Sequence, residues 1–334
     1  SMPLGADADA AGEVWFLARH QTGVTLDAWG DGLLVVVDQP PTEKNPRGTT
    51  MITLTTYGLS DTAFADLQAR WQGWWDERFE TVGPGCDWQV GDRVCALLAG
   101  GGMAQEVVVD GRHALPVPEG MTLQEAAALP EVYATAWLNL FQLAALKPGE
   151  KVLLHAGASG VGSAAIQLCK AFGNPCWVSV GSPERLAHCE ALGAQGGVVR
   201  TDDLQALRDF GPFDVILDPV GGQYAALNLD VLARDGRWVN IGLMGGRTAE
   251  LDLALVLGKR IQLIGSTLRN RDELFKAELL QTLRQHVWPL FAEGRLTAQL
   301  QGTFAAKDAE QAFDVLSSNQ VNGKLVLVVD PNLV

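Results

Sequence analysis

The stretch "HAGASGVGSAAIQL", residues 155–168, decides the fold of this chain. It continues the apolar run "KVLLHA", and small and apolar residues then recur at helical spacing, so the order predicts a strand, a glycine-rich turn and a helix. Gly157, Ser159 and Gly162, with Gly160 in addition, follow the G-x-G-x-x-G spacing with a serine in the middle. In such a turn the backbone can approach a pyrophosphate, which then sits at the helix N-terminus. A glycine-rich turn without a ligand is the weaker alternative, because a series of strands and helices follows.

Segments of strand and helix character alternate after this turn. The strands "PCWVSVG", "FDVILDPV", "RWVNIGLMG" and "RIQLIGSTL" are separated by the helical segments "PERLAHCEALGA" and "QYAALNLDVLARDG". Another helix is predicted to begin with a capping box from Thr122 to Glu125 and to break near Pro130. A helix at 272–292 and a strand at 323–330 close the chain. This alternation predicts right-handed βαβ units, and hence an α/β Rossmann domain with a doubly wound parallel sheet.

The first part of the chain has a different texture. The runs "LLVVVDQ" (33–39), "TTMITLTTYG" (49–58), "DRVCALLAG" (92–100) and "AQEVVVD" (104–110) are short, apolar or alternating, and separated by Gly and Pro. They predict an antiparallel, barrel-like domain. The length of 334 residues suits two domains of ordinary size.

Charge and cysteine content exclude several functions. The net charge of −14 argues against nucleic acid or an anionic membrane as partner, because both require a basic patch. There is no apolar run of 18 residues, so a cytoplasmic protein is expected. The cysteines form no CxxC pair and no HExxH occurs, so we expect buried thiols in a reducing compartment and no metal. The five cysteines are Cys86, Cys95, Cys169, Cys176 and Cys189.

The end of the second Rossmann strand indicates which nucleotide binds. An NAD site usually has an acidic residue there for the ribose 2′-hydroxyl. Here the strand ends in Gly181 and Ser182, and Arg185 follows. Hydroxyl and guanidinium donors suit a 2′-phosphate, and Arg200 after the next strand could close on the same group. This favours NADP; the alternative is that both arginines are solvated surface residues.

Several motifs together resemble the medium-chain dehydrogenase/reductase superfamily, in particular its zinc-free NADPH:quinone oxidoreductases of the zeta-crystallin and p53-inducible type. They include "VGPGCDWQVGDRVCALLAGGGMAQEVVV", "LKPGEKVLLHAGASGVGSAAIQL", "DVILDPVGGQYAALNLDVLARDGRWVNIGLMGG" and the terminal "GKLVLVV". The resemblance covers roughly residues 82–330. It implies a GroES-like β-barrel-type catalytic domain in two pieces, 1–125 and 270–334, around a Rossmann NADP-binding domain at 126–269.

The resemblance also assigns cofactor contacts by position. It implies NADPH as cofactor, with Ser159, Gly160 and Val161 as the phosphate loop, between Gly157 and Gly162. Ser182 and Arg185 would contact the 2′-phosphate, and Arg200 stands where the family usually has a tyrosine. For the nicotinamide side it implies Thr135, Gly242, Leu243 and Leu268.

The substrate side departs from the family pattern. Tyr57 and Ser60 are the candidates to hydrogen-bond the acceptor carbonyl, and Ser60 is the nearest equivalent of a family asparagine. Only "WWDERFET" (74–81) stands where the family has a longer segment, and Met103 replaces a usual aromatic residue.

The resulting hypothesis is an NADPH-dependent oxidoreductase that transfers hydride, without zinc, to a small-molecule electrophile such as a quinone or a conjugated carbonyl. An enoyl or alkenal reductase on the same scaffold is one alternative. A non-catalytic NADPH-binding protein, whose altered N-terminal segment serves a partner, is another. Analogy with the family predicts a homodimer.

Overall fold

A computed structural model describes most of the chain after residue 91 and six strands before it. The described residues are these strands within 6–56, Trp88, 92–104, Val107, 109–200, 204–318 and 320–329. The chain divides into two compact units, of which the first comprises Ser1–Asp92 and Gly100–Ala114. The second comprises Arg93–Ala99 and Leu115–Val334, and it contains the glycine-rich turn.

The described strands of the first unit are antiparallel, as the sequence predicts. Four of them form one sheet in chain order, β3 (Ala18–Arg19), β4 (Val24–Trp29), β5 (Gly32–Gln39) and β6 (Thr49–Thr56), and β1 (Ala6–Ala8) pairs with β2 (Val14–Phe16). The positions of β5 and β6 confirm the strands predicted within 33–39 and 49–58. The short helix η1 (Gly111–His113) also belongs to this unit.

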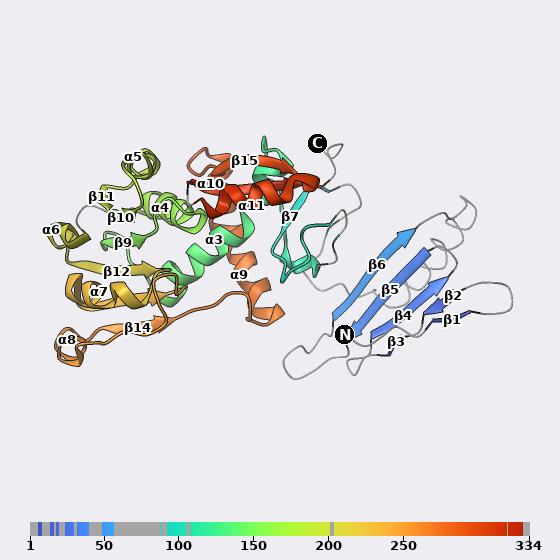
Figure 1. The fold of residues 1–334 in the computed structure, drawn as a ribbon, viewed down its shortest axis with the longest axis horizontal. Coiled ribbons are helices and arrows are strands. Elements are labelled where there is room, and N and C mark those ends of the chain that lie inside the picture. The colour runs from blue at the N-terminus through green and yellow to red at the C-terminus, as the bar shows by residue number, and fades with distance from the viewer. Residues whose placement is uncertain are drawn as a thin grey trace. The chain divides into compact units, whose positions relative to one another are not determined.

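A six-stranded parallel sheet forms the centre of the second unit (Figure 1). Its strands are β9 (Val152–His155), β10 (Cys176–Val180), β11 (Gly196–Val199), β12 (Phe213–Asp218), β13 (Leu232–Asn240) and β14 (Gln262–Gly265). Their order in the sheet is β11-β10-β9-β12-β13-β14, and every pairing is parallel. This is the Rossmann order 3-2-1-4-5-6, so the predicted doubly wound sheet is confirmed.

Helices cover both faces of this sheet. In the view of Figure 1, α4 (Gly160–Phe172) and α5 (Pro183–Leu192) lie above β9 and β12, and α7 (Ala225–Val231) lies below β12. The strand β9 shows why both faces must be covered. Val152 and Leu154 belong to one apolar cluster, which includes α3 and α4, while Leu153 belongs to the other, which includes α7. Side chains that alternate between two apolar layers are expected of a buried parallel strand.

The helix after the glycine-rich turn begins and ends where the sequence predicts. Ser159 is its N-cap, and the Ser159 hydroxyl accepts the N–H of Gly162 at 3.1 Å. Gly173 ends it in the left-handed conformation, with φ of 79°. The predicted capping box is also present at α2 (Leu123–Ala127), and α3 (Pro130–Trp137) begins at the predicted break. A π-helical turn, η2 (Leu138–Leu143), continues α3.

Two helix predictions were too long. The helix predicted at 272–292 is two helices, α9 (Glu273–His286) and α10 (Trp288–Ala292), because Pro289 has no N–H to continue the first one. The segment after β12 leaves the helical conformation at Leu232 and enters β13, which contains a bulge in its pairing with β12.

The remaining elements lie in the second unit, apart from Ala114, which the first unit contains. They are β7 (Val94–Ala96), β8 (Ala114–Pro116), η3 (Leu204–Ala206), α6 (Leu207–Phe210), η4 (Gly222–Tyr224), α8 (Leu253–Lys259), β15 (Leu300–Ala305), η5 (Ala306–Asp308), α11 (Ala309–Ser317) and β16 (Lys324–Val328). The strand β16 confirms the predicted final strand and pairs with β15 in parallel.

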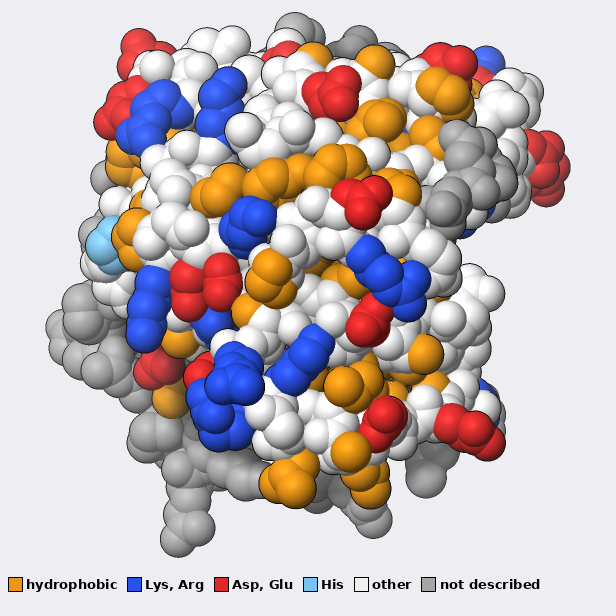
Figure 2. All heavy atoms as spheres, turned by 90° about the vertical axis from the view of Figure 1, so that its left-hand side faces the viewer, with side chains coloured by type: hydrophobic (Ala, Val, Ile, Leu, Met, Phe, Trp, Pro, Cys, Tyr) orange, Lys and Arg blue, Asp and Glu red, His pale blue; other side chains and the backbone are white. Residues whose placement is uncertain are grey.

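The surface of the second unit mixes charged and apolar side chains. The left-hand side of Figure 1, which carries α8, faces the viewer in Figure 2, where basic side chains lie among acidic and apolar ones. Leu253 and Leu257 on α8 are strongly exposed. No helix of the described part of the chain is long and apolar enough to cross a membrane.

Candidate functional site

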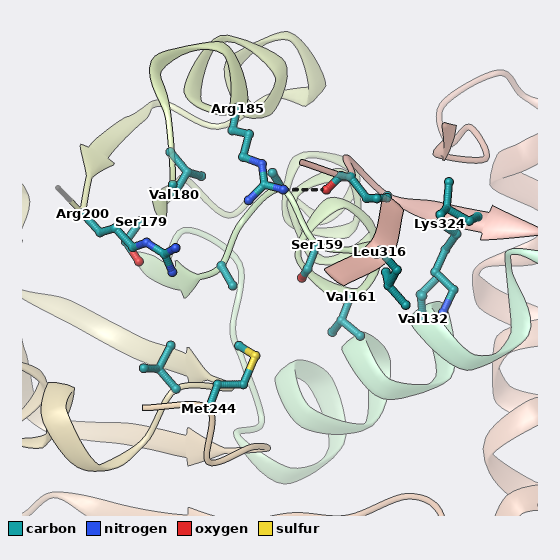
Figure 3. Close-up of a pocket in the computed structure, with 18 of the residues that line it drawn as sticks. Val132, Ser159, Val161, Ser179, Val180, Arg185, Arg200, Met244, Leu316 and Lys324 are labelled. Carbon is teal, nitrogen blue, oxygen red and sulfur yellow. Dashed lines mark hydrogen bonds between the residues drawn. The ribbon is translucent and has the colours of Figure 1, made fainter. Parts of the chain in front are cut away.

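A pocket of about 610 Å³ opens at the carboxyl ends of the parallel strands (Figure 3). Five of its lining residues each follow the end of a different strand. They are Ala156 after β9, Gly181 after β10, Arg200 after β11, Val220 after β12 and Met244 after β13. The chain reverses its direction of winding between β9 and β12, so the pocket lies at the point of the sheet where α/β proteins bind ligands.

The glycine-rich turn forms one wall of this pocket. Ser159, Gly160 and Val161, the predicted phosphate loop, line it. Gly162 lies behind them, where a Cβ would be only 2.4 Å from the carbonyl oxygen of Gly157. A Cβ on Gly157 would itself lie 2.5 Å from Val178 Cγ1. The turn therefore requires glycine at both outer positions, and the N-terminal N–H groups of α4 border a space that suits an anion.

Two arginines converge at the end of β10. Arg185 Nη1 and Arg200 Nη2 lie 3.3 and 3.7 Å from the point that a Cβ on Gly181 would occupy. Both side chains line the pocket, and no carboxylate among the described residues pairs with either of them. Burial, followed by the charge of Arg200, lowers the pKa of Arg185. Two guanidinium groups that no described carboxylate neutralises form an anion-binding corner.

The hydroxyl of Ser182 contributes to this corner by binding the backbone of Arg185. It accepts the N–H of Arg185 at 3.4 Å and so caps α5. It also lowers the pKa of Glu184 through a hydrogen bond. Ser182 is absent from the described residues that line the pocket, although its neighbour Gly181 lines it.

The C-terminal segment forms the opposite wall, which the sequence prediction did not include. Arg185 donates to the carbonyl of Val321 at 3.0 Å, and Gly323 N donates to the carbonyl of Ala158 at 2.9 Å. The stem of Lys324 packs against the glycine-rich turn, with its Cδ 2.7 Å from the point that a Cβ on Gly160 would occupy. The motif "GKLVLVV" was recognised in the sequence, but its position beside the loop follows only from the tertiary structure.

Lys324 also brings an acidic side chain to the pocket. Its Nζ lies 3.6 Å from Glu131 Oε2, and both residues line the cavity. Glu131 is the one carboxylate among the described lining residues. Ser179 and Tyr224 line the pocket as well, and neither was predicted.

The residues predicted for the nicotinamide side lie outside this pocket. Thr135 on α3 donates its hydroxyl to Glu131 Oε1 at 3.1 Å. Gly242 packs against the Pro219 carbonyl, where a Cβ would be 2.6 Å from the oxygen, and Leu243 is 56% exposed. Leu268 packs against the larger apolar cluster. Tyr57 and Ser60, the candidate catalytic residues, lie outside the described residues.

The described residues contain no group of three or more His, Cys, Asp or Glu side chains that could hold a metal ion. Cys95, Cys169, Cys176 and Cys189 are buried free thiols, and Cys86 lies outside the described part of the chain. Burial raises the pKa of both Cys95 and Cys189 to about 12, so these two thiols are poor nucleophiles.

Comparisons with known proteins agree with this architecture. The family described as zinc-binding dehydrogenase matches residues 160–284. The quinone oxidoreductase of Thermus thermophilus, solved also in complex with NADPH, superimposes with a TM-score of 0.65 at 31% identity. That alignment covers 72% of this chain and 78% of the other. The CurK enoyl reductase aligns with a TM-score of 0.62 at 25% identity, over 90% of this chain and 79% of the other.

Sequence relatives are longer proteins. The polyketide synthase GfsB of Streptomyces halstedii is 33% identical over 77% of this chain, which spans 4% of that protein. The synaptic vesicle membrane protein VAT-1 homolog of Danio rerio is 30% identical over 85% of this chain, which spans 65% of that protein. The strand order, the glycine-rich turn and these similarities together establish that the chain belongs to the medium-chain dehydrogenase/reductase superfamily.

Proposed function

We propose that the protein is an NADPH-dependent oxidoreductase that transfers hydride to quinones or related conjugated carbonyls without zinc. The observation that carries the proposal is the pair of arginines at the end of β10. Arg185 and Arg200 converge beside Gly181, where an NAD site would have an acidic side chain. A 2′-phosphate is the group that such a corner binds best, and NADPH differs from NADH by that phosphate alone.

The residues of the pocket fit a dinucleotide. Gly162 leaves room for close approach of the backbone, so the pyrophosphate would lie at the N-terminus of α4 against Ser159, Gly160 and Val161. Lys324, whose stem already packs against the glycine-rich turn, would supply a positive charge to the same phosphates. When bound, the cofactor supplies a hydride from its nicotinamide ring to an electron-poor acceptor. The chain's own residues bind and orient the two reactants and exclude water.

The relatives of known structure or sequence favour two different classes of acceptor. The quinone oxidoreductases of Thermus thermophilus and Pseudomonas syringae favour a quinone, whose oxygens can take protons from solvent. The CurK enoyl reductase and the polyketide synthase relatives favour an enoyl substrate, which makes an enoyl or alkenal reductase the second candidate. Reduction of an enoyl group requires a proton at the α-carbon, and therefore a positioned donor.

The remaining sequence predictions belong to the same proposal. They are the two-piece catalytic domain at 1–125 and 270–334, the acceptor contacts of Tyr57 and Ser60, a homodimer, and a location in the cytoplasm. Thr135, Gly242, Leu243 and Leu268 would contact the nicotinamide half of the cofactor from outside the pocket described above.

Steady-state assays test the proposal. We expect oxidation of NADPH, followed by its absorbance at 340 nm, with ortho- or para-quinones, unaffected by a zinc chelator. Turnover of a 2-alkenal or an enoyl thioester but not of quinones would establish the second candidate. Binding of NADPH without turnover of any acceptor would indicate a non-catalytic NADPH-binding protein. Equal affinity for NADH and NADPH would contradict the role of the arginine pair.

A further inference from the structure

A chain of buried polar side chains leads from the centre of the sheet to the wall of the pocket. Asp218, at the end of β12, is fully buried, and four donors surround its carboxylate. Oδ1 accepts the N–H groups of Val220 and Gly221 at 2.7 and 3.0 Å. Oδ2 accepts Asn228 Nδ2 at 3.0 Å and Trp238 Nε1 at 2.9 Å. All four described partners of this carboxylate are donors, so it accepts in all four bonds.

This carboxylate determines the direction of every bond that follows. The side-chain amide of Asn228 donates its N–H to Asp218. The other end of that amide, Asn228 Oδ1, therefore faces His155 Nε2, at 2.8 Å. An amide oxygen only accepts, and therefore Nε2 carries the hydrogen. Burial lowers the pKa of His155, which favours the neutral ring. In a neutral ring with hydrogen on Nε2, Nδ1 is an acceptor.

The last member of the chain is Ser179, which lines the pocket beside Arg200 (Figure 3). Its Oγ lies 2.7 Å from His155 Nδ1. Because Nδ1 accepts, the single hydroxyl hydrogen of Ser179 is used in this bond. Only the lone pairs of Oγ remain for a ligand, although a serine hydroxyl is normally able to donate as well as accept.

We infer that Ser179 is a specificity residue that accepts a hydrogen bond from the adenosine half of the cofactor, and that His155, Asn228 and Asp218 are positioning residues that hold it in the acceptor state. The inference rests on the proposed binding of NADPH. It predicts a division of labour in the pocket: the arginines bind the 2′-phosphate, which only accepts, and Ser179 binds a group that donates. In NADPH the 2′-hydroxyl is esterified, so the adenosine half offers two such groups, the ribose 3′-hydroxyl and the 6-amino group of adenine.

Calorimetric titration of the full chain tests the inference. The probes are NADPH, its 3′-deoxy analogue and its hypoxanthine analogue, which lacks the 6-amino group. We expect S179A to bind NADPH about fivefold more weakly, as for the loss of one hydrogen bond of about 1 kcal/mol. S179T keeps the hydroxyl and should bind as the wild type does. The analogue that lacks the group bound by Ser179 should bind the wild type about fivefold more weakly than NADPH. S179A should bind that analogue and NADPH equally well. The analogue that meets both conditions identifies the donor as the 3′-hydroxyl or the 6-amino group.

A second measurement needs no variant in the pocket. Nitrogen-15 NMR of the histidines in the wild-type protein should show His155 protonated at Nε2 and bare at Nδ1. Protonation at Nδ1 would overturn the inference, and so would unchanged NADPH binding by S179A, or an equal loss of affinity for the critical analogue in wild type and S179A. Failure of the wild-type chain to bind NADPH would overturn the proposed function, whereas normal NADPH binding with an indifferent S179A would overturn this inference alone.

Discussion

Gly162 is the residue of the glycine-rich turn where a side chain fits least. A Cβ there would meet two backbone oxygens, Gly157 O at 2.4 Å and Ala156 O at 2.6 Å, which cannot rotate away as a side chain could. We therefore expect Gly162→Ala to lower the free energy of unfolding by about 1–3 kcal/mol and to weaken NADPH binding. Urea unfolding and calorimetric titration measure the two effects.

Gly258 provides the matched control, since it is also a glycine within a helix. No atom lies within 4 Å of the point its Cβ would occupy. Gly258→Ala should stabilise the protein by up to about 1 kcal/mol through helix propensity and leave NADPH binding unchanged. A Gly162→Ala protein with normal stability and cofactor affinity would show that the loop tolerates displacement.

The arginine pair gives a prediction about cofactor choice. Arg185→Ala should weaken NADPH binding about tenfold or more and leave NADH binding nearly unchanged, because the side chain lines the corner that we propose binds the 2′-phosphate. Titration with both cofactors checks it. Arg208→Ala is the control: Arg208 lies on α6 and forms an exposed ion pair with Asp230 of α7, so its loss should change neither affinity. Equal weakening of both cofactors by Arg185→Ala would instead point to its hydrogen bond with the Val321 carbonyl.

At the scale of single elements, sequence patterns predicted well what local chemistry determines. The helix α4 begins at Ser159 and ends at Gly173, and α2 has its capping box, because caps act within four residues of the chain. The helix predicted at 223–236 is present as α7 but was predicted to extend too far, since pairing of Leu232 with Phe213 on β12 recruits its last residues into the sheet. The same reason explains why Lys324 and Ser179 were missed in the pocket: their positions depend on contacts distant in sequence.

Lys259 tests how one such distant contact stabilises an element. It lies at the end of α8, and its Nζ donates to the carbonyls of Leu229, Asp230 and Leu232 at 2.9, 2.6 and 2.8 Å. These carbonyls end α7, where helical carbonyl groups lack partners. Lys259→Met keeps the stem but loses the donors, so we expect the free energy of unfolding to fall by about 1.5–3 kcal/mol. Lys307→Met, at an exposed position of η5, should change it little, and equal effects of the two changes would contradict this reasoning.

At the scale of the whole molecule, His155 links stability to pH. Burial lowers the pKa of His155, and the charge of Asp218 and the hydrogen bond to Asn228 oppose this shift. The ring of Tyr224 packs edge-on against the imidazole, with 4.7 Å between the ring centroids. A lowered folded-state pKa means that the unfolded chain binds more protons as pH falls below about 6.5, the ordinary value for histidine. The stabilisation from neutral His155 is therefore complete above that pH and is lost progressively below it.

Urea unfolding between pH 7.5 and 5.5 measures this effect. The wild type should lose stability over the window, and His155→Gln should lose less because its amide does not titrate. His188, whose pKa burial also lowers, contributes equally in both proteins and so cancels from the comparison. Identical slopes for the two proteins would show that protonation of His155 does not limit stability.

The cofactor pocket joins three parts of the second unit that are distant in sequence. Ser159 forms a parallel bridge with Gly323, and Arg185 donates to the Val321 carbonyl, so the glycine-rich turn, the end of β10 and the C-terminal segment share hydrogen bonds.

A ligand that binds only the folded state adds stability, about 2.7 kcal/mol at 100 times its Kd. We therefore expect NADPH to slow hydrogen–deuterium exchange together in 156–162, 179–185 and 320–325, measured by mass spectrometry. NADH should protect the first segment and leave the other two less protected, because it lacks the phosphate that we propose Arg185 binds. Protection of the loop alone by NADPH would mean that the C-terminal segment takes no part in cofactor binding.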